Sequence, residues 1–107
     1  MADPQKRLMY LEKVTREGAT DPMAWYGLAL EYKNAARVDD ALRTFEALRE
    51  KNVDYVPAYL MCGQMLAEAG RKDEARSWLE NGIVRARATG NSHALGEMES
   101  ALAGLDA

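Results

Sequence analysis

Apolar residues between positions 22 and 35 recur at helical spacing along two stripes. The first stripe repeats every three or four residues, as on one face of a helix, and consists of Trp25, Leu28, Ala29 and Tyr32. The second stripe is offset from the first and consists of Met23, Tyr26 and Leu30. A helix in a small protein normally buries one stripe and exposes the other face to water. The second apolar stripe therefore needs a separate explanation.

The same pattern along the whole chain predicts six helices and no strands. Helix-forming residues dominate, while valine is sparse and isoleucine occurs once. Two Asp-Pro pairs, at 3–4 and 21–22, each provide an N-cap residue followed by proline at the first helical position. Glycines mark helix ends at Gly18, Gly70 and Gly90. The predicted helices, joined by short connections that favour antiparallel hairpins, cover about 4–17, 22–35, 39–51, 56–69, 73–89 and 92–105.

Residues 21–54 align with residues 55–88 when the chain is shifted against itself by 34 positions. Identical residues coincide at several positions, among them Ala41 with Ala75. Similar residues coincide along the predicted buried face: Trp25 with Tyr59, Leu28 with Cys62, Ala29 with Gly63, Tyr32 with Leu66 and Phe45 with Leu79. The chain therefore contains two copies of one helical hairpin.

This pattern resembles the tetratricopeptide repeat (TPR) family, whose motif W-x2-L-G-x2-Y…A-x3-F has a period of 34 residues. The first copy carries it as Trp25, Leu28, Ala29, Tyr32, Ala41 and Phe45, and the second as Tyr59, Cys62, Gly63, Leu66, Ala75 and Leu79. The resemblance implies an all-α fold of antiparallel helix hairpins, an α-solenoid. It also implies a single TPR domain over 1–107, with a capping helix in 1–20, repeats at 21–54 and 55–88, and a second capping helix in 89–107.

Small residues predict where the helices approach most closely. Ala29 and Gly63 are small enough to let the two helices of a hairpin touch, and Ala41 and Ala75 are the small residues that face them. Three positions depart from the family's pattern: Ala36 replaces a usual turn glycine, and Leu48 and Gly82 replace usual alanines.

The terminal helices are expected to cover the apolar faces that stacked repeats leave open at their ends. The first presents Leu8, Leu11 and Val14, and the last presents Leu95, Met98, Leu102 and Leu105. We expect Trp78, beside the buried stripe of the preceding helix, to contact the C-terminal helix. Gly96 and Gly104 each cost that helix about 1 kcal/mol relative to alanine, so we expect it to be the least stable element.

Composition and charge limit the classes of partner. The net charge of −3 argues against nucleic acid, whose partners usually show a basic excess. Basic residues between 71 and 87 alternate with acidic ones, which favours a solvated surface over an anionic partner. No signal-peptide segment and no run of 18 apolar residues occurs, so we expect no membrane insertion. A single cysteine, Cys62, fits a reducing compartment, and we expect a cytoplasmic protein.

The sequence offers no constellation for catalysis. Its one histidine, His93, opens the last predicted helix, where an exposed first-turn residue is the ordinary interpretation. Cys62 stands at a core position, with no base placed near it in the sequence. Metal-ligand spacings and glycine-rich phosphate loops are absent. We therefore expect no enzyme activity, no cofactor and no metal.

The TPR resemblance explains the second stripe. In this family the first helix of each hairpin lines a concave groove, which would contain Met23, Tyr26, Leu30 and Asn34 from the first repeat and Leu60 and Gln64 from the second. We therefore expect a non-catalytic protein–protein interaction module, a scaffold or adaptor, that binds a peptide or protein in this groove. An alternative stays open, in which the stripe is shielded by adjacent helices or by a second copy of the chain in a homodimer.

Overall fold

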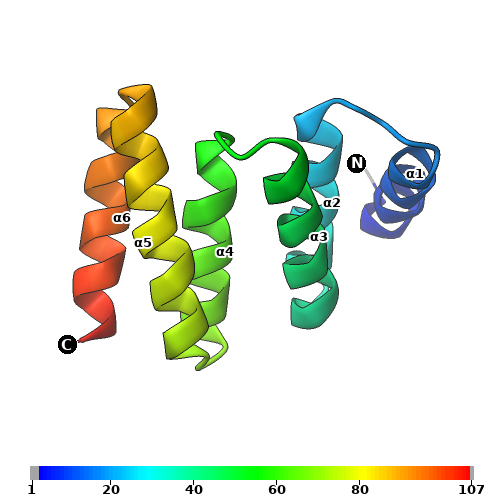
Figure 1. Ribbon diagram of the computed structural model, residues 1–107. Coiled ribbons are helices and arrows are strands. Elements are labelled where there is room, and N and C mark those ends of the chain that lie inside the picture. The colour runs from blue at the N-terminus through cyan, green and yellow to red at the C-terminus, as the bar shows by residue number, and fades with distance from the viewer. Residues whose placement is uncertain (1–2, 107) are drawn as a thin grey trace. The chain divides into compact units, whose positions relative to one another are not determined.

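The computed structural model describes residues 3–106, which form six α-helices and no strand (Figure 1). These are α1 (Pro4–Arg16), α2 (Pro22–Asn34), α3 (Val38–Lys51), α4 (Val56–Glu68), α5 (Lys72–Thr89) and α6 (Ser92–Leu105). The all-α class is confirmed, and every predicted helix end lies within one residue of the observed end. The predicted capping segments include residues 1, 2 and 107, which lie outside the described residues.

The chain divides into two compact units, Met1–Asn52 with α1 to α3 and Val53–Ala107 with α4 to α6. Whether both units act as one domain stays a prediction. None of the helices in residues 3–106 combines the length and the apolar character needed to cross a bilayer.

Side-chain caps fix the beginnings of three helices. The carboxylates of Asp3 and Asp21 each accept a hydrogen bond from the backbone N–H two residues later, at 2.9 Å in both cases. The side chain of Asn91 accepts a bond from the N–H of Ala94 at the start of α6. The first N–H groups of a helix have no partner within it. These bonds therefore explain why the Asp-Pro pairs predicted the starts of α1 and α2.

A residue with positive φ follows the end of four helices: Gly18 at 91° after α1, Ala36 at 60° after α2, Gly70 at 78° after α4 and Gly90 at 71° after α5. In each case the N–H of the following residue donates to the carbonyl five residues earlier, as Arg37 does to Tyr32 at 2.9 Å. Ala36 is the one non-glycine residue with positive φ among residues 3–106. The left-handed conformation costs an L-residue roughly 1–2 kcal/mol. The turn after α2 therefore adopts the left-handed conformation that the family's turn glycine usually provides, although an alanine occupies the position.

We expect Ala36→Gly to raise the free energy of unfolding by about 1 kcal/mol, because glycine adopts positive φ without strain. Urea denaturation followed by circular dichroism measures the change. The matched control is Gly70→Ala at the equivalent turn of the second repeat, which should lower stability by a similar amount. A loss of stability in Ala36→Gly would contradict this account of the turn.

In the first unit, α2 contacts both α1 and α3. In Figure 1, α1 is seen nearly along its axis while α2 is seen from the side, so the two helices cross at a large angle. Gly27 of α2 is buried at this crossing, where a Cβ would lie 3.5 Å from the Leu11 side chain. The fully buried side chains of the unit are Ala29, Ala41, Phe45 and Leu48.

Two aromatic residues of the first stripe lie at the edge of this core rather than inside it. Trp25 is half-buried; its indole N–H donates to the carbonyl of Ala19 at 2.8 Å, and the Lys51 ammonium lies 5.0 Å from its ring centroid. Tyr32 is also half-buried, and its hydroxyl donates to the Glu12 carboxylate at 2.5 Å. The polar tip of each ring thus keeps a partner at the surface. The bond to Glu12 ties α2 to α1.

Burial, and then the hydrogen bond to Glu12, raise the pKa of Tyr32 from its ordinary value of 10.0 to about 12. The folded protein therefore keeps a proton that the unfolded chain releases near pH 10, so its stability should fall as pH rises from about 10 to about 12. We expect Tyr32→Phe to show a smaller fall, measured by urea denaturation across this range. The control is Tyr10→Phe, at a residue that is 64% exposed. Equal falls in both variants would contradict the assignment.

In the second unit, α4, α5 and α6 all contact one another. Tyr59, Cys62, Leu66, Leu79 and Met98 are almost or fully buried. Within the predicted stripe of α6, Met98 and Leu105 are buried, whereas Leu95 and Leu102 are half-buried. Trp78 packs against the ring of Tyr59, with centroids 5.7 Å apart. Its expected contact with the C-terminal helix stays a prediction.

Two glycines of the second unit lie where helices approach closely. A Cβ on Gly63 would lie 2.6 Å from Cδ2 of Leu79, so α4 and α5 touch at the position that the sequence predicted. A Cβ on Gly82 would collide with the Met98 sulfur and would lie 2.5 Å from Cβ of Tyr59. Gly82 thus replaces the family's usual alanine because α5 packs against α4 and α6 at one point.

Candidate functional site

Four of the predicted groove residues lie on α2. Met23 is 67% exposed, Asn34 is exposed and Leu30 is half-buried. Tyr26 is half-buried, and its ring meets the edge of Phe45 on α3 with centroids 6.4 Å apart. These residues lie outside the fully buried face of α2. Tyr26 nevertheless contributes to the packing of its own unit.

The other two predicted groove residues lie on α4. Leu60 and Gln64 are both half-buried. Gln64 also lines a shallow hollow of about 660 Å³, whose other lining residues, between Ser92 and Ala101, all belong to α6. Because α2 belongs to one unit and α4 to the other, a single groove shared by all six residues stays a prediction.

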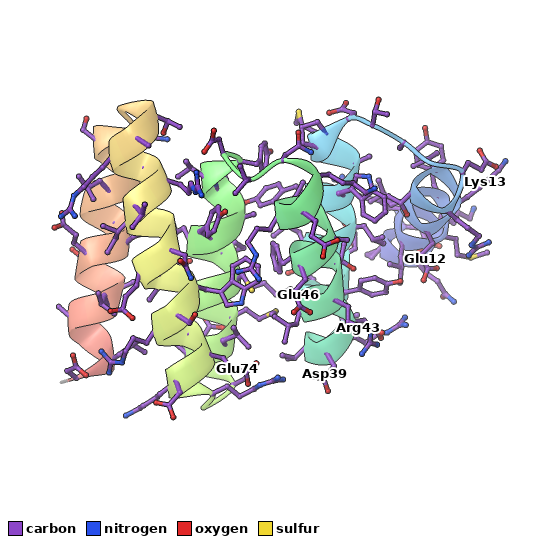
Figure 2. All side chains as sticks on the ribbon, in the orientation of Figure 1. Glu12, Lys13, Asp39, Arg43, Glu46 and Glu74 are labelled. Carbon is purple, nitrogen blue, oxygen red and sulfur yellow. The ribbon has the colours of Figure 1, made fainter. Side chains whose placement is uncertain are left out.

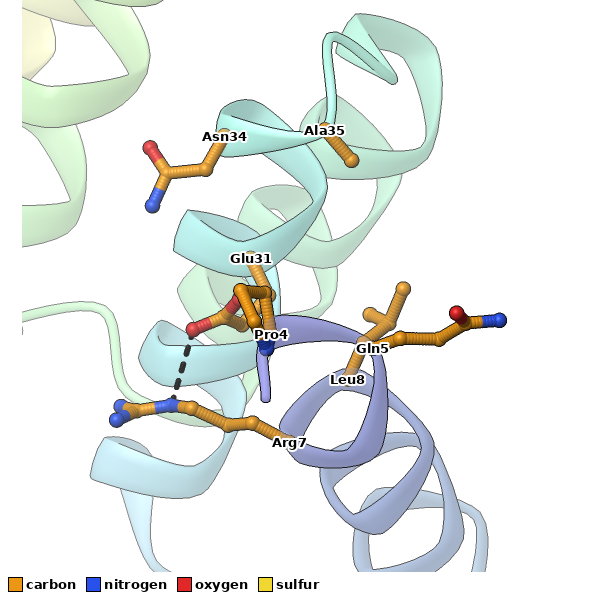
Figure 3. A pocket seen from close by; sticks show the side chains of 7 residues that line it. All are labelled: Pro4, Gln5, Arg7, Leu8, Glu31, Asn34 and Ala35. Carbon is orange, nitrogen blue, oxygen red and sulfur yellow. Dashed lines mark ion pairs between the residues drawn. The ribbon is translucent and has the colours of Figure 1, made fainter. Parts of the chain in front are cut away.

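A pocket of about 590 Å³ lies between α1 and α2, and no pattern in the sequence predicted it. Figure 3 shows its seven lining residues and the ion pair at its rim, where Arg7 Nε lies 3.0 Å from Glu31 Oε1. Asn34 is the one predicted groove residue that also lines this pocket. Apolar spacing in α1 predicted contact with α2, but the crossing of the two helices is set by tertiary packing. The apolar part of the lining consists of Pro4, Leu8 and Ala35.

The arginines of the α5 region are paired with acidic side chains. This pairing agrees with the solvated surface that the alternation of charges predicted. The hydrogen bond from Arg76 holds the pKa of the Asp106 carboxyl below its usual range. The four pairs are Arg71–Glu74 at 2.7 Å, Arg76–Asp106 at 2.5 Å, Arg85–Asp54 at 3.6 Å and Arg87–Glu99 at 3.8 Å.

The two residues with the most reactive side chains occupy ordinary structural positions. His93 is exposed in the first turn of α6, and its Nε2 lies 2.5 Å from the Glu97 carboxylate. Cys62 is fully buried. Within residues 3–106, no three His, Cys, Asp or Glu side chains are grouped so that they could hold a metal ion.

Solved structures resemble this chain, although no family model and no curated protein matches it. The crystal structure of a tetratricopeptide repeat domain protein from Salinibacter ruber has a TM-score of 0.72 and 32% identity, covering 80% of this chain and 96% of that one. The solution structure of a TPR domain protein from the same organism has a TM-score of 0.74 at 32% identity, covering 80% and 87%.

A third similar structure supports the fold alone, because its sequence identity to this chain is lower. The solution structure of a protein from Bordetella parapertussis has a TM-score of 0.79 at 23% identity and covers 99% of this chain and 89% of that one. The six observed helices, the repeated motif and the identity to the Salinibacter protein agree with one another. The chain belongs to the tetratricopeptide repeat family of helical repeat modules.

Proposed function

We propose that this protein is a non-catalytic interaction module, a scaffold or adaptor, that binds a peptide or protein through the groove residues of α2 and α4. TPR modules typically serve in protein interaction. The observation that carries the proposal is the second stripe of α2. Met23 is 67% exposed and Leu30 is half-buried, although α2 already contacts both neighbouring helices of its unit. An apolar stripe with polar neighbours is a typical docking surface for a peptide.

Tyr26 and Leu30 are the proposed anchors of this surface. Binding energy usually concentrates in a few partly buried anchors, and a tyrosine offers a large apolar ring with a polar tip. The edge contact with Phe45 supports the Tyr26 ring before a partner arrives. A ring held in this way loses less side-chain entropy on binding than a free one. Leu60 and Gln64, both half-buried on α4, are the proposed binding residues of the second repeat.

Partner capture from a native cell extract tests the proposal with variants of the stripe. Met23→Ser and Leu30→Glu should each lose the captured partner. Tyr26→Ala is less informative, because it also removes the contact with Phe45. The matched control is Val84→Glu on α5, where a side chain that is 58% exposed receives the same charge. Capture that is unchanged by both stripe variants would refute binding through this surface.

The self-association alternative makes a different prediction. If a second copy covers the stripe, the chain should sediment as a dimer at micromolar concentration, and Leu30→Glu should convert it to a monomer. A monomeric parent protein would leave the stripe free for a foreign partner. Sedimentation velocity on the parent and on Leu30→Glu therefore separates the two functions.

We also propose that the protein resides in a reducing compartment such as the cytoplasm. The chain has a single cysteine, Cys62, which is fully buried, and structural disulfides are rare in such compartments. Fractionation of native cells with an antibody against the protein checks this placement.

A further inference from the structure

The pocket between α1 and α2 begins where the apolar stripe of α2 ends. Leu30 of the stripe and Asn34 lie one helical turn apart, and Asn34 is also part of the pocket lining. Figure 3 shows the side chains of Asn34 and Arg7 extending toward the left of the view, with the Glu31 carboxylate between them. A segment that lies along the stripe therefore meets this pocket next to Leu30.

The apolar lining of the pocket is left partly uncovered by the fold. Pro4 and Leu8, one turn apart on α1, face the pocket together with Ala35 at the end of α2. Pro4 and Ala35 are exposed, and Leu8 is half-buried. The volume of about 590 Å³ lies within the usual range of ligand pockets, about 300–1,000 Å³. An apolar group that enters the pocket would cover these side chains.

The charges that line the pocket balance each other. Among residues 3–106, the charged lining residues are Arg7 and Glu31, whose Nε and Oε1 atoms lie 3.0 Å apart. Asp3 is engaged in the cap of α1, and Glu12 and Lys13, labelled in Figure 2, lie further along this helix and do not line the pocket. A carboxylate in the pocket would meet Glu31, and an ammonium group would meet Arg7. The pocket therefore favours an uncharged side chain.

The polar groups beside the pocket suit a peptide backbone. Asn34 carries both an amide donor and a carbonyl acceptor. The Arg7 guanidinium has five N–H donors; Nε faces Glu31, and Nη2 lies 3.9 Å from the position that a Cβ on Gly27 would occupy. A helical peptide uses its backbone N–H and C=O groups internally, whereas an extended peptide leaves them available. An extended segment is therefore the better match.

We propose that this pocket holds a leucine-like side chain of an extended peptide segment, whose next-but-one residue rests on Leu30. The inference rests on the proposed function, because the stripe and the pocket would bind one segment. Leu30 and Asn34 lie about 6 Å apart along the helix axis. Side chains on one side of an extended chain are about 6.6–6.8 Å apart. The partner is thus recognised by two apolar residues separated by a single residue.

The first probe is N-acetyl-leucine methylamide, which combines one apolar side chain with two peptide groups. At millimolar concentration it should shift the amide NMR signals of Asn34 and Ala35 in the full chain. The glutamate and lysine analogues should both bind about tenfold more weakly or worse, because only the leucine side chain gains from burial.

Ala35→Phe should abolish the binding of the leucine probe, because the ring fills the pocket from an exposed position. The matched control is Ala69→Phe, at the equivalent exposed C-cap of α4, which should bind the probe as the parent does. Circular dichroism confirms that both variants fold.

The second probe is acetyl-Ser-Leu-Ser-Leu-Ser-amide, whose pattern reads the same in both directions. It should bind about tenfold more tightly than a peptide of the same composition with adjacent leucines, which point to opposite sides of an extended chain. Leu30→Glu should remove this preference and leave the binding of N-acetyl-leucine methylamide unchanged.

Four outcomes would overturn the proposal: no shift at Asn34 and Ala35, a shift that persists in Ala35→Phe, equal binding of a charged analogue, or no preference for alternating leucines. A parent dimer that Ala35→Phe converts to a monomer would show that a second copy fills the pocket, and would also overturn it. Partner capture with Met23→Ser tests the proposed function separately. Loss of capture without leucine binding would refute the pocket alone, whereas leucine binding with unchanged capture would refute the partner surface alone.

Discussion

Ala41→Trp and Gly63→Trp should each lower the melting temperature strongly or prevent folding. Ala41 is fully buried, and a Cβ alone on Gly63 would already lie 2.6 Å from Cδ2 of Leu79. Overpacking a core costs about 1–3 kcal/mol and occasionally more, out of a total stability of about 5–15 kcal/mol for a domain. In a chain of this size, each kcal/mol corresponds to roughly 4–8 °C. Thermal melting followed by circular dichroism measures the loss.

The control for both variants is Ala103→Trp, which adds the same ring at an exposed position of α6. It should melt close to the parent, since exposed substitutions usually change stability by about 0.5 kcal/mol or less. If the two core variants also melted within a few degrees of the parent, the placement of the close helix contacts would be wrong.

Gly82→Ala should lower the free energy of unfolding by about 1–3 kcal/mol, the usual cost of overpacking. The new methyl group would lie 2.5 Å from Cβ of Tyr59, which is attached directly to the backbone of α4 and cannot swing away. Helix propensity alone predicts the opposite sign, a gain of about 1 kcal/mol for alanine over glycine. A fall in the free energy of unfolding would show that the close approach of α5 to α4 outweighs helix propensity. A rise would show the opposite.

Gly96→Ala on α6 is the matched control, because nothing lies within 4 Å of the position that its Cβ would occupy. It should gain about 1 kcal/mol from helix propensity. Urea denaturation of both variants measures the difference. A gain in Gly82→Ala equal to that in Gly96→Ala would contradict the packing of α4, α5 and α6 described above.

Helix positions could be predicted from the sequence because their signals are local. Asp3 and Asp21 cap the helices that they precede, and Gly18, Gly70 and Gly90 lie just after the ends of α1, α4 and α5. The positive φ of Ala36 could not be read from the residue itself. It follows from the hydrogen bond between Arg37 and Tyr32 that closes α2. The tight fit at Gly82 was equally hidden, because it depends on the docking of both α4 and α6.

The candidate site was only partly predictable for a similar reason. Helical spacing revealed the α2 stripe, because Met23, Tyr26 and Leu30 are offset from the buried face of the same helix. The edge contact of Tyr26 with Phe45 needed the tertiary structure. The basic residues between 71 and 87 form a local positive excess in the sequence. In the structure the arginines of this region are neutralised by ion pairs.

Thermal melting of Leu30→Glu tests most directly whether the α2 stripe is open to a partner. We predict that the variant melts within about 4 °C of the parent, because a glutamate on an open surface stays hydrated. The control is Leu48→Glu, at a fully buried position of α3. It shows how far the melting temperature falls when an unpaired carboxylate is buried, a change that is strongly destabilising. A fall for Leu30→Glu comparable to that of Leu48→Glu would show that the stripe is internal packing or a dimer interface, and would contradict the proposed binding surface.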